Sequence, residues 1–259
     1  MRLLPIPDLQ KKVIDIHRLT TRQISNGITE EDVKITILPF ARTGAEPLGS
    51  MGSDVPLAVL SKQSQHISNY FKQYFAQVSN PPIDPIRERL VMSLYTRIGK
   101  SLNLLKETAE HSRQVHISQP ILSRDDFYRI KGLTQYGMDY CIIDATLDIA
   151  NEETLRMAIG KICDKAEDAV NKGNSILIIS NRKENKSKAA IPSLLATGSV
   201  HHHLVNKKLR TQAGIVVECS DAWETHHFAT IIGYGASAIY PYLTYDTTVS
   251  YTHLTLPTI

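Results

Sequence analysis

The second half of the chain alternates between short apolar runs and longer segments with helical spacing. Residues 176–179 (ILII) form a continuous apolar run, which is typical of a strand covered on both faces. Residues 152–171 space their apolar side chains as an amphipathic helix does, and they end just before Gly173. The same patterns predict further strands at 140–143, 213–217 and 238–240, and further helices starting at Ser123 and spanning 193–206 and 225–232.

Strands and helices therefore follow one another at nearly even spacing over residues 119–248. This order favours right-handed βαβ units, and hence a parallel sheet with helices outside it. The predicted fold class is α/β. The pattern by itself allows either an open sheet or a barrel.

Residues 8–118 form a less regular part of the chain, which we expect to be mostly helical where it is ordered. Residues 8–25 carry apolar groups at helical spacing among charges. Thr29 marks the start of a second helix, because its hydroxyl can cap the first turn and the acidic residues after it complement the positive helix end.

An irregular region follows over residues 40–84, where only short helices are expected. Pro85 fits the first turn of the next helix, since its missing N–H would have no partner there. Residues 95–118 show no clear period and predict a long surface connection. The helices expected in this region cover residues 66–70, 71–78 and 86–94.

Composition and charge are those of an ordinary globular protein. Of 259 residues, 42% are hydrophobic and 21% are charged, which supports a substantial core and argues against disorder. The net charge of +3 is too small, and the basic residues too scattered, to indicate nucleic-acid binding. The densest basic stretch, residues 182–188, also contains Glu184 and is interpreted as a solvated loop. No apolar run approaches membrane-spanning length, so we expect neither nucleic acid nor membrane as a partner.

The three cysteines, Cys141, Cys163 and Cys219, form no CxxC pair. Their odd number and apolar surroundings predict reduced thiols in a cytoplasmic or plastid compartment rather than a disulfide framework or a cluster site.

Two motifs suggest ligand sites but have simpler explanations. Gly233 and Gly235 begin a GxGxxA spelling, but here a helix precedes and a strand follows, the reverse of what pyrophosphate binding requires. His201, His202 and His203 are consecutive on a predicted helix, so their side chains point about 100° apart and cannot converge on one metal ion. We expect one or two of them to hydrogen-bond neighbouring segments instead.

Polar residues follow the predicted strands at the edge where α/β enzymes place catalytic groups. Asp144 and Asp148 come after the first strand, Ser180, Asn181 and Arg182 after the second, and Glu218 after the third. Such an edge can form an active site. It can equally be kept polar by loop capping or by docking to another domain.

Two irregular segments are the most specific feature of the chain. Residues 46–60 (EPLGSMGSDVPLAVL) are rich in types that adopt unusual backbone angles or bond their own backbone. Residues 70–88 (YFKQYFAQVSNPPIDPIRE) run into Asn80, Pro81 and Pro82, which force an extended turn. A compact domain rarely keeps two such loops without a function. Ser50, Ser53 and Asp54 lack the neighbourhood of a nucleophile elbow, however, so a hydrolase triad is rejected.

Both segments closely resemble the central domain of the glutamate synthase large subunit. The likeness continues in ILIISNR, IPSLLATGSVHHHL, GIVVE and WETHHFATIIGYGASAIYPYL, in that order along the chain. The resemblance implies an incomplete (β/α) barrel-like sheet that carries no flavin. It also implies no catalytic, cofactor-binding or metal-binding residues in this chain. Many relatives have Asp where this chain has Asn181, so this position is not expected to titrate.

The resemblance further implies a parent enzyme that makes glutamate from glutamine, 2-oxoglutarate and a reductant. An amidotransferase domain releases ammonia, and a synthase domain with FMN and a 3Fe–4S cluster uses it with electrons from ferredoxin or an NAD(P)H-dependent partner. The isolated chain is then an inactive fragment that holds the two domains together and lines part of the ammonia path. Candidate tunnel or interface residues are Gly49, Ser50, Met51, Gly52, Ser53, Asp54, Asn80, Pro81, Pro82, Asn181 and Arg182.

Two other functions stay open at this point. One is a self-sufficient flavin-binding or phosphate-binding barrel enzyme, and the other is a docking module with no part in a tunnel.

We expect residues 1–248 to form this one central domain, with 8–118 and 119–248 as its two parts. Residues 249–259 (VSYTHLTLPTI) depart from the family and resemble translated sequencing-adapter DNA. We therefore expect a non-native tail that packs poorly, the alternative being a divergent strand and turn. Met1 is expected to be an arbitrary fragment start.

Overall fold

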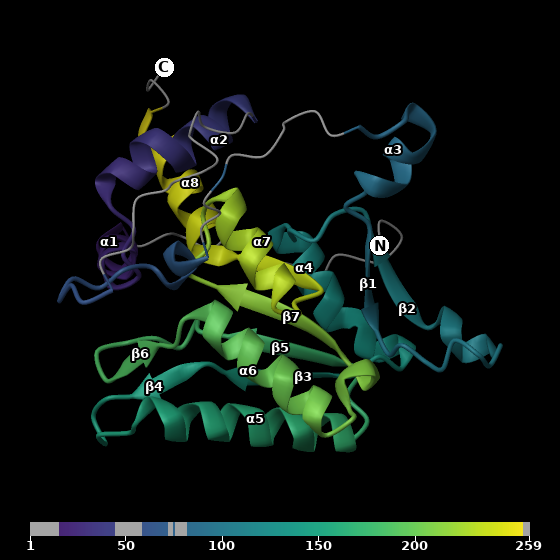
Figure 1. The fold of residues 1–259 in the computed structure, drawn as a ribbon. Helices are drawn as coiled ribbons and strands as arrows, with labels where there is room; N and C mark the ends of the chain where they lie inside the picture. The colour runs from purple at the N-terminus through teal and green to yellow at the C-terminus, as the bar shows by residue number, and fades with distance from the viewer. Residues whose placement is uncertain (1–15, 45–58, 72–74, 76–81, 256–259) are drawn as a thin grey trace.

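A four-stranded parallel sheet forms the centre of the protein (Figure 1). The computed structural model describes residues 16–44, 59–71, 75 and 82–255. All residues of the three strands β5, β7 and β8 are buried, as the continuous apolar runs predicted. The strand order is β3 (Tyr140–Asp144), β5 (Ile176–Ser180), β7 (Gly214–Cys219) and β8 (Ala238–Pro241).

The sheet is open. In the part of the chain that the structure describes, β3 and β8 lie at its two ends and do not pair with each other. Beyond β8 the sheet continues only as a parallel bridge between Ile121 and Ile239. The α/β class with a parallel sheet is confirmed. The incomplete barrel-like character implied by the resemblance is not confirmed, since the described strands form an open sheet of four.

Alternate residues of each strand face two separate cores, since successive side chains point to opposite sides of a sheet. Leu177 and Ile179 pack in one core, and Ile176 and Ile178 pack in the other. The first core is covered by α5 (Leu155–Asn171), α6 (Ser193–Asn206) and α7 (Thr225–Gly233). The second is covered by α4 (Arg124–Lys131), α8 (Tyr242–Thr255) and the N-terminal helices.

The helix starts follow their capping residues. The Ser123 hydroxyl accepts a hydrogen bond from Asp126 N at 3.1 Å, so α4 begins where it was predicted. Helix α5 begins three residues later than its predicted start at Glu152. That residue has a φ of 52°, which is incompatible with a right-handed helix, and Thr154 is the cap.

The N-terminal part is helical, as expected. Helix α1 (Ile16–Ser25) matches the described end of the predicted helix over residues 8–25. Thr29 Oγ1 then accepts from Asp32 N at 3.1 Å. The chain continues as the wide-turned η1 (Asp32–Ile37) and as α2 (Leu38–Thr43).

Two further short helices agree with expectation. The 3₁₀ turn η2 (Ile67–Tyr70) matches the helix expected near 66–70, while most of 71–78 lies outside the described residues. Helix α3 (Pro85–Val91) has Pro85 in its first turn, and the Asp84 carboxylate accepts from the first backbone N–H groups.

The predicted surface connection over residues 95–118 is wrong. Strands β1 (Thr96–Gly99) and β2 (Gln114–Ile117) pair in antiparallel fashion, and Ile98 is fully buried in the second core. Each strand has only four residues, too few to show a clear alternating pattern, and a polar tip of 14 residues separates them. The hairpin therefore gave no recognisable period.

The remaining elements are short. A second antiparallel ribbon pairs β4 (Thr146–Asp148) with β6 (Lys188–Ala190). None of the described helices is long and apolar enough to cross a membrane. The other 3₁₀ turns are η3 (Ala109–Ser112), η4 (Gly132–Tyr136) and η5 (Arg210–Gln212).

The start of the expected tail belongs to α8. Ser250 is 8% exposed, and Tyr251 packs against the second core. The expectation of poor packing is therefore wrong for these two residues, and the alternative of a strand is wrong as well. A non-native origin of residues 249–259 stays a prediction.

The burial of Ile98 makes a direct test of the hairpin. We expect Ile98→Ala to lower the free energy of unfolding in urea by about 2–5 kcal/mol, because it leaves a cavity in the second core. Leu104→Ala, at a side chain 91% exposed in the hairpin tip, should change it by less than about 0.5 kcal/mol. Equal effects of the two substitutions would show that the hairpin does not belong to the core.

Candidate functional site

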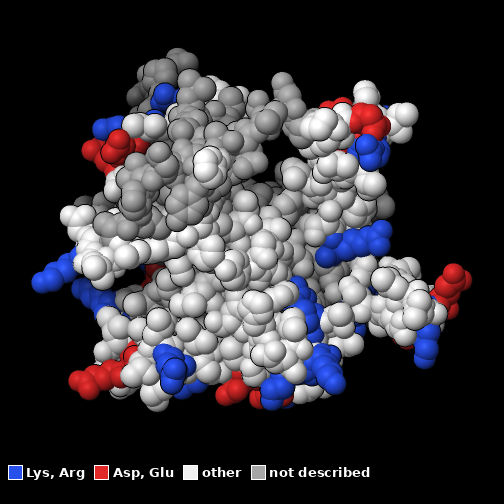
Figure 2. Space-filling model, in the orientation of Figure 1, with Lys and Arg blue, Asp and Glu red and all other residues white. Residues whose placement is uncertain are grey.

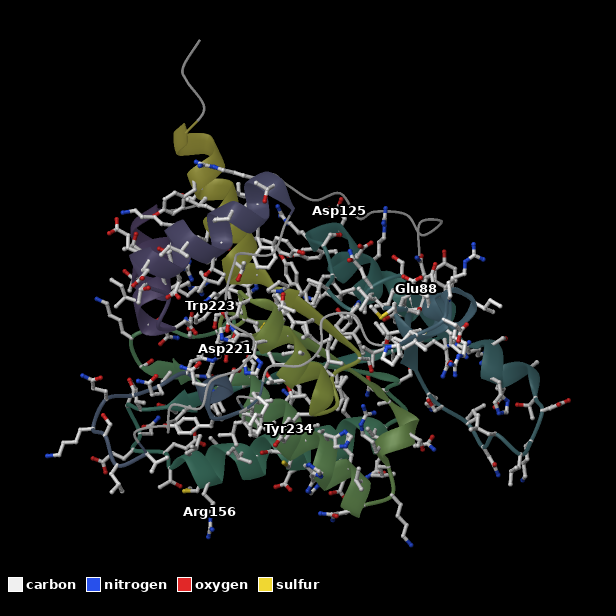
Figure 3. The ribbon with its side chains drawn as sticks, turned by 45° about the horizontal axis from the view of Figure 1, so that its top comes forward. Glu88, Asp125, Arg156, Asp221, Trp223 and Tyr234 are labelled. Atoms are coloured by element: carbon white, nitrogen blue, oxygen red, sulfur yellow. The ribbon has the colours of Figure 1, made fainter. Side chains whose placement is uncertain are left out.

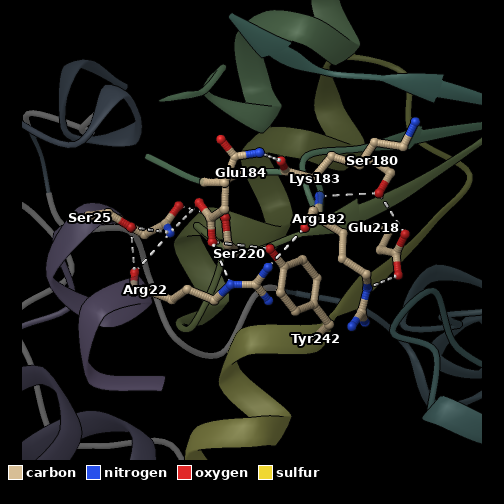
Figure 4. Close-up of polar contacts among 11 residues, drawn as sticks. Arg22, Ser25, Ser180, Arg182, Lys183, Glu184, Glu218, Ser220 and Tyr242 are labelled. Carbon is tan, nitrogen blue, oxygen red and sulfur yellow. Dashed lines mark hydrogen bonds and ion pairs between the residues drawn. The ribbon is translucent and has the colours of Figure 1, made fainter. Parts of the chain in front are cut away.

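The carboxyl ends of the central strands form one polar edge (Figure 4). Asp144 is the last residue of β3, Ser180 is the last residue of β5, and Glu218 lies one residue before the end of β7. The three occupy adjacent register positions across the sheet. The prediction that polar groups gather here is confirmed for these residues. Asp148 does not join them, because it lies in β4 and accepts hydrogen bonds from the turn at Ala150 and Asn151.

Glu218 is the buried charge at the centre of this edge. Its Oε2 accepts from the Ser180 hydroxyl at 2.6 Å, and its Oε1 accepts from Arg182 Nε at 2.5 Å. The Arg182 guanidinium also lies 4.1 Å from the centre of the Tyr242 ring on α8. Burial opposes the charge on Arg182, but the Glu218 carboxylate outweighs it and raises the pKa of the guanidinium. This ion pair joins β5, β7 and α8.

A second buried carboxylate, Glu184, joins the edge to the N-terminal helix. It lies 3.4 Å from Arg22 Nε and accepts from Asn26 Nδ2 at 2.9 Å. Arg22 also donates to the Arg182 carbonyl oxygen at 2.9 Å, and Ser220 donates to Asn26 at 2.5 Å. Burial raises the pKa of Glu184 despite these partners.

The interpretation of residues 182–188 as a solvated loop is therefore wrong for its first part. Arg182 and Glu184 side chains are 29% and 7% exposed, and both form ion pairs within the fold. A charge-rich stretch looks solvated in sequence, because its partners Arg22 and Glu218 lie about 160 and 36 residues away.

Asn181 is buried beside the start of α6. Its Nδ2 donates to Ser193 Oγ at 3.3 Å. Ser193 in turn donates from both its backbone N–H and its hydroxyl to the Asp221 carboxylate, at 2.8 and 2.5 Å. Helix α6 follows Pro192, which has no capping side chain, so Asp221 supplies the cap from the loop after β7.

A polar cleft of about 490 Å³ opens next to Asp221. His66 lies at one wall, where its Nε2 is 2.9 Å from the Asp221 carbonyl oxygen. Its ring stacks on His227 at 4.1 Å and meets the edge of Trp223 at 5.1 Å. His227 Nε2 lies 3.1 Å from a Glu224 carboxylate oxygen. Figure 3 shows Asp221 and Trp223 together at this point.

These contacts fix the η2 segment along α7. Ser68 Oγ lies 3.2 Å from Thr230 Oγ1, and His226 Nε2 lies 2.9 Å from the Ser68 carbonyl oxygen. Phe71 packs edge-on against Tyr234, with ring centres 5.4 Å apart. The η2 segment is thus anchored along α7, with His66 at the carboxyl side of the sheet.

Only three of the eleven candidate residues lie in the described part of the chain. Asn181 and Arg182 sit at the sheet edge, and Pro82 is exposed just before α3. Gly49, Ser50, Met51, Gly52, Ser53, Asp54, Asn80 and Pro81 lie outside the described residues. The sequence reasoning did not single out Arg22, Asn26 or Tyr242, and His66 lay in a region read only as a short helix.

The two rejected motifs behave as expected. Gly235 has a φ of 111°, and a Cβ there would meet the His201 ring at 2.2 Å, so this turn joins α7 to β8 by close packing. His201 Nδ1 accepts from Arg210 Nε at 2.9 Å, while His203 contacts Glu167 at 2.7 Å. The histidines thus bond to different neighbouring segments.

Residues 21–255 match the family model described as glutamate synthase central domain. The chain belongs to the glutamate synthase central domain family. It is 44% identical over 229 residues to a glutamate synthase [NADPH] large chain of Bacillus subtilis, and 40% identical over 244 residues to a ferredoxin-dependent glutamate synthase of Pyropia yezoensis. A glutamate synthase [NADH] of Schizosaccharomyces pombe is 41% identical over 220 residues.

The matches cover 88%, 93% and 84% of this chain but only 15%, 16% and 10% of those relatives. The chain therefore spans a small part of the length of the curated relatives it matches. The family match also continues to residue 255, beyond residue 248 where we expected this glutamate synthase central domain to end.

The buried ion pair of the central domain can be tested by removing one partner. We expect Arg182→Ala to lower the free energy of unfolding by about 3 kcal/mol, because Glu218 is left buried without its counter-charge. Lys34→Ala removes an exposed pair with Glu30 and should cost less than about 1 kcal/mol in the same urea titration. An Arg182→Ala effect no larger than that of Lys34→Ala would contradict the role given to this pair.

The anchoring by His66 should depend on pH. Burial, and then the neighbouring His227, lower the pKa of His66 from 6.5, against weaker opposing effects of Asp221 and Glu224. As the pH falls, His66 of the unfolded chain therefore binds a proton before His66 of the folded chain does. The stability that neutral His66 provides is complete above about pH 6.5 and is lost as the pH falls through the lower pKa of the folded state.

We expect the free energy of unfolding to fall more steeply between about pH 7.5 and about pH 5.5 in the wild type than in His66→Gln, which keeps a polar side chain but cannot titrate. Urea unfolding at several pH values measures the two slopes. Parallel slopes would mean that His66 is not held neutral by the fold.

Proposed function

We propose that this chain is the connecting domain of a full-length glutamate synthase. It holds an amidotransferase domain and an FMN-dependent synthase domain in register and contributes wall to the ammonia path between them. The parent reaction converts glutamine, 2-oxoglutarate and a reductant into two molecules of glutamate. Family membership and the small share of the relatives' length that the chain spans both support this assignment.

The observation that carries the proposal is that the carboxylates at the sheet edge are paired with other residues of the fold. Glu218 is paired with Arg182, and Glu184 with Arg22. Asp221 receives two hydrogen bonds from Ser193. A catalytic carboxylate has to reach a substrate, whereas Glu218 and Glu184 are buried, and all three carboxylates join segments distant in sequence. Such pairing holds distant segments in fixed positions, which is what a scaffold requires.

The anchor at η2 supports a role for the flanking loops. It lies between residues 45–58 and 72–81, which hold most of the candidate tunnel residues. His66 and Ser68 bind this segment to α7 and to the loop after β7. A passage for neutral ammonia must be narrow and closed to bulk water so that the ammonia is not protonated. A segment between the two loops that is fixed to the sheet edge suits that requirement.

The FMN and the 3Fe–4S cluster belong to another domain of the parent. Two features support this assignment. A Cβ at Gly235 would meet the His201 ring, so this glycine serves the close packing of the turn against α6. Cys141, Cys163 and Cys219 lie on β3, α5 and β7 rather than in one loop, and burial raises the pKa of Cys163 and Cys219, which disfavours the thiolate that a cluster needs.

The electron donor of the parent is ferredoxin or an NAD(P)H-dependent partner. The relatives' own names include ferredoxin, NADH and NADPH forms, so similarity alone supports all three donors.

The cytoplasm or a plastid is proposed as the location of the parent, and the bacterial and chloroplastic relatives support this proposal. The sheet is proposed to be an incomplete (β/α) barrel-like sheet, and the order of its four parallel strands, which follows their order along the chain, supports this view.

The tunnel role can be tested in the full-length chain with its flavin and cluster. Ser50→Phe and Gly52→Leu should reduce glutamine-dependent glutamate synthesis much more than ammonia-dependent synthesis, because they narrow the path without touching the synthase site. The ratio of the two rates is the measurement. Ser61→Phe, at an exposed position that follows this segment in the sequence, is the matched control and should leave the ratio unchanged. Equal loss of both activities would mark Ser50 and Gly52 as folding determinants instead.

A further inference from the structure

Helix α3 and the segment after it expose a run of large apolar side chains. Leu90 is 80% exposed and Ile86 88%. Exposed apolar residues are ordinary when scattered singly, but a contiguous group marks an interaction surface. We call this group the α3 patch, consisting of Ile86, Leu90, Val91, Met92, Leu94 and Tyr95.

The helix that carries the patch is exposed along its whole length. None of the seven residues of α3 is buried. Asp84 caps it, and such a cap is worth only about 1 kcal/mol. A helix this short is marginal in water unless its apolar face packs against something. Ile86 and Leu90 lie one turn apart and so share the face that needs cover.

The base of the patch is nevertheless held firmly. β1 begins directly after Tyr95, and its Ile98 is fully buried. Thr96 Oγ1 donates to the Ser237 carbonyl oxygen at 3.2 Å, and Ser101 N donates to the Thr211 carbonyl oxygen at 2.7 Å. Figure 1 shows α3 standing away from the sheet at the end of this hairpin. The patch is thus presented on a fixed support.

The surface around the patch has the make-up of an interface. Arg87, Glu88 and Arg89 interrupt the apolar residues along the helix and are exposed. In Figure 2 the same segment, at the upper right, shows uncharged surface between side chains of both signs. An apolar centre with a mixed polar rim is the usual anatomy of a protein–protein contact.

The length of the relatives indicates what covers the patch. The chain spans 15% of the Bacillus subtilis large chain and 16% of the Pyropia yezoensis enzyme. If this chain is part of such a polypeptide, most of that polypeptide lies outside the structure. A covalently linked domain is present at high effective concentration and occupies an apolar patch before a free partner does.

We infer that the α3 patch is the docking surface for a neighbouring domain of the same full-length polypeptide. This inference rests on the proposed function and adds the surface through which the connecting domain contacts its neighbour. It separates the contact from the ammonia path: the patch lies on the β1–β2 side, whereas the cleft and the η2 anchor lie at the carboxyl edge.

The test measures how accessible the patch is in two proteins. Leu90→Cys is made in this 259-residue chain and in the full-length chain that contains it, and each is labelled with a thiol reagent. The introduced thiol should react at least about tenfold more slowly in the full-length chain, because a covered side chain is reached only through an opening event. Met157→Cys, on an exposed position of α5, gives the rate of an uncovered helical thiol in the short chain.

Equal labelling rates in the two proteins would overturn the inference. Protection in the short chain that grows with concentration, together with a doubled mass in sedimentation, would assign the patch to a second copy and would also overturn it. Glutamate formation is measured on the unsubstituted full-length chain. Failure of that activity rejects the proposed function, whereas an active chain with an unprotected thiol rejects only the docking surface.

Discussion

Buried carboxylates at the carboxyl edge of the sheet are the constraint on which the rest of the structure depends. A parallel sheet brings the ends of its strands together, and here the charged residues Glu218 and Glu184 are drawn below the surface. Each needs a cation within hydrogen-bonding distance, since an unpaired buried charge is far more costly than an exposed one. Arg182 and Arg22 meet that need, and in doing so they bring α1 against β5 and α8.

This arrangement adds polar links between the irregular N-terminal part and the regular βα part, which also share the second core. Leu19 and Ile98 pack in that core with Ile176 of β5. Arg22 and Asn26 reach Glu184, Arg182 and Ser220 across about 160 to 194 residues of sequence. A connecting domain has to transmit position rather than perform chemistry, and polar contacts with defined geometry specify one arrangement more strictly than apolar packing alone.

Much of the fold could be predicted from the sequence, and the exceptions have physical reasons. The buried strands and long helices were found because their apolar period continues for several turns or residues, as in 176–179 and 193–206. The β1–β2 hairpin was missed because its four-residue strands are only partly buried and mix polar with apolar residues, unlike the equally short but fully buried β8. The incomplete barrel-like character came from the resemblance, whereas the apolar runs predicted the four strands of the sheet and left its curvature open. The edge was correctly predicted to be polar, but its pairings are contacts between distant residues, which one sequence does not reveal.

Asp221 serves two neighbours at once. Its carboxylate caps α6 through Ser193, and its backbone carbonyl holds His66 of the η2 segment. Ser193 and His66 therefore share a partner, although no contact between them is observed. Substitutions at these two positions should then be energetically non-additive, and disturbance of one loop can reach the start of a helix on the other side of the cleft.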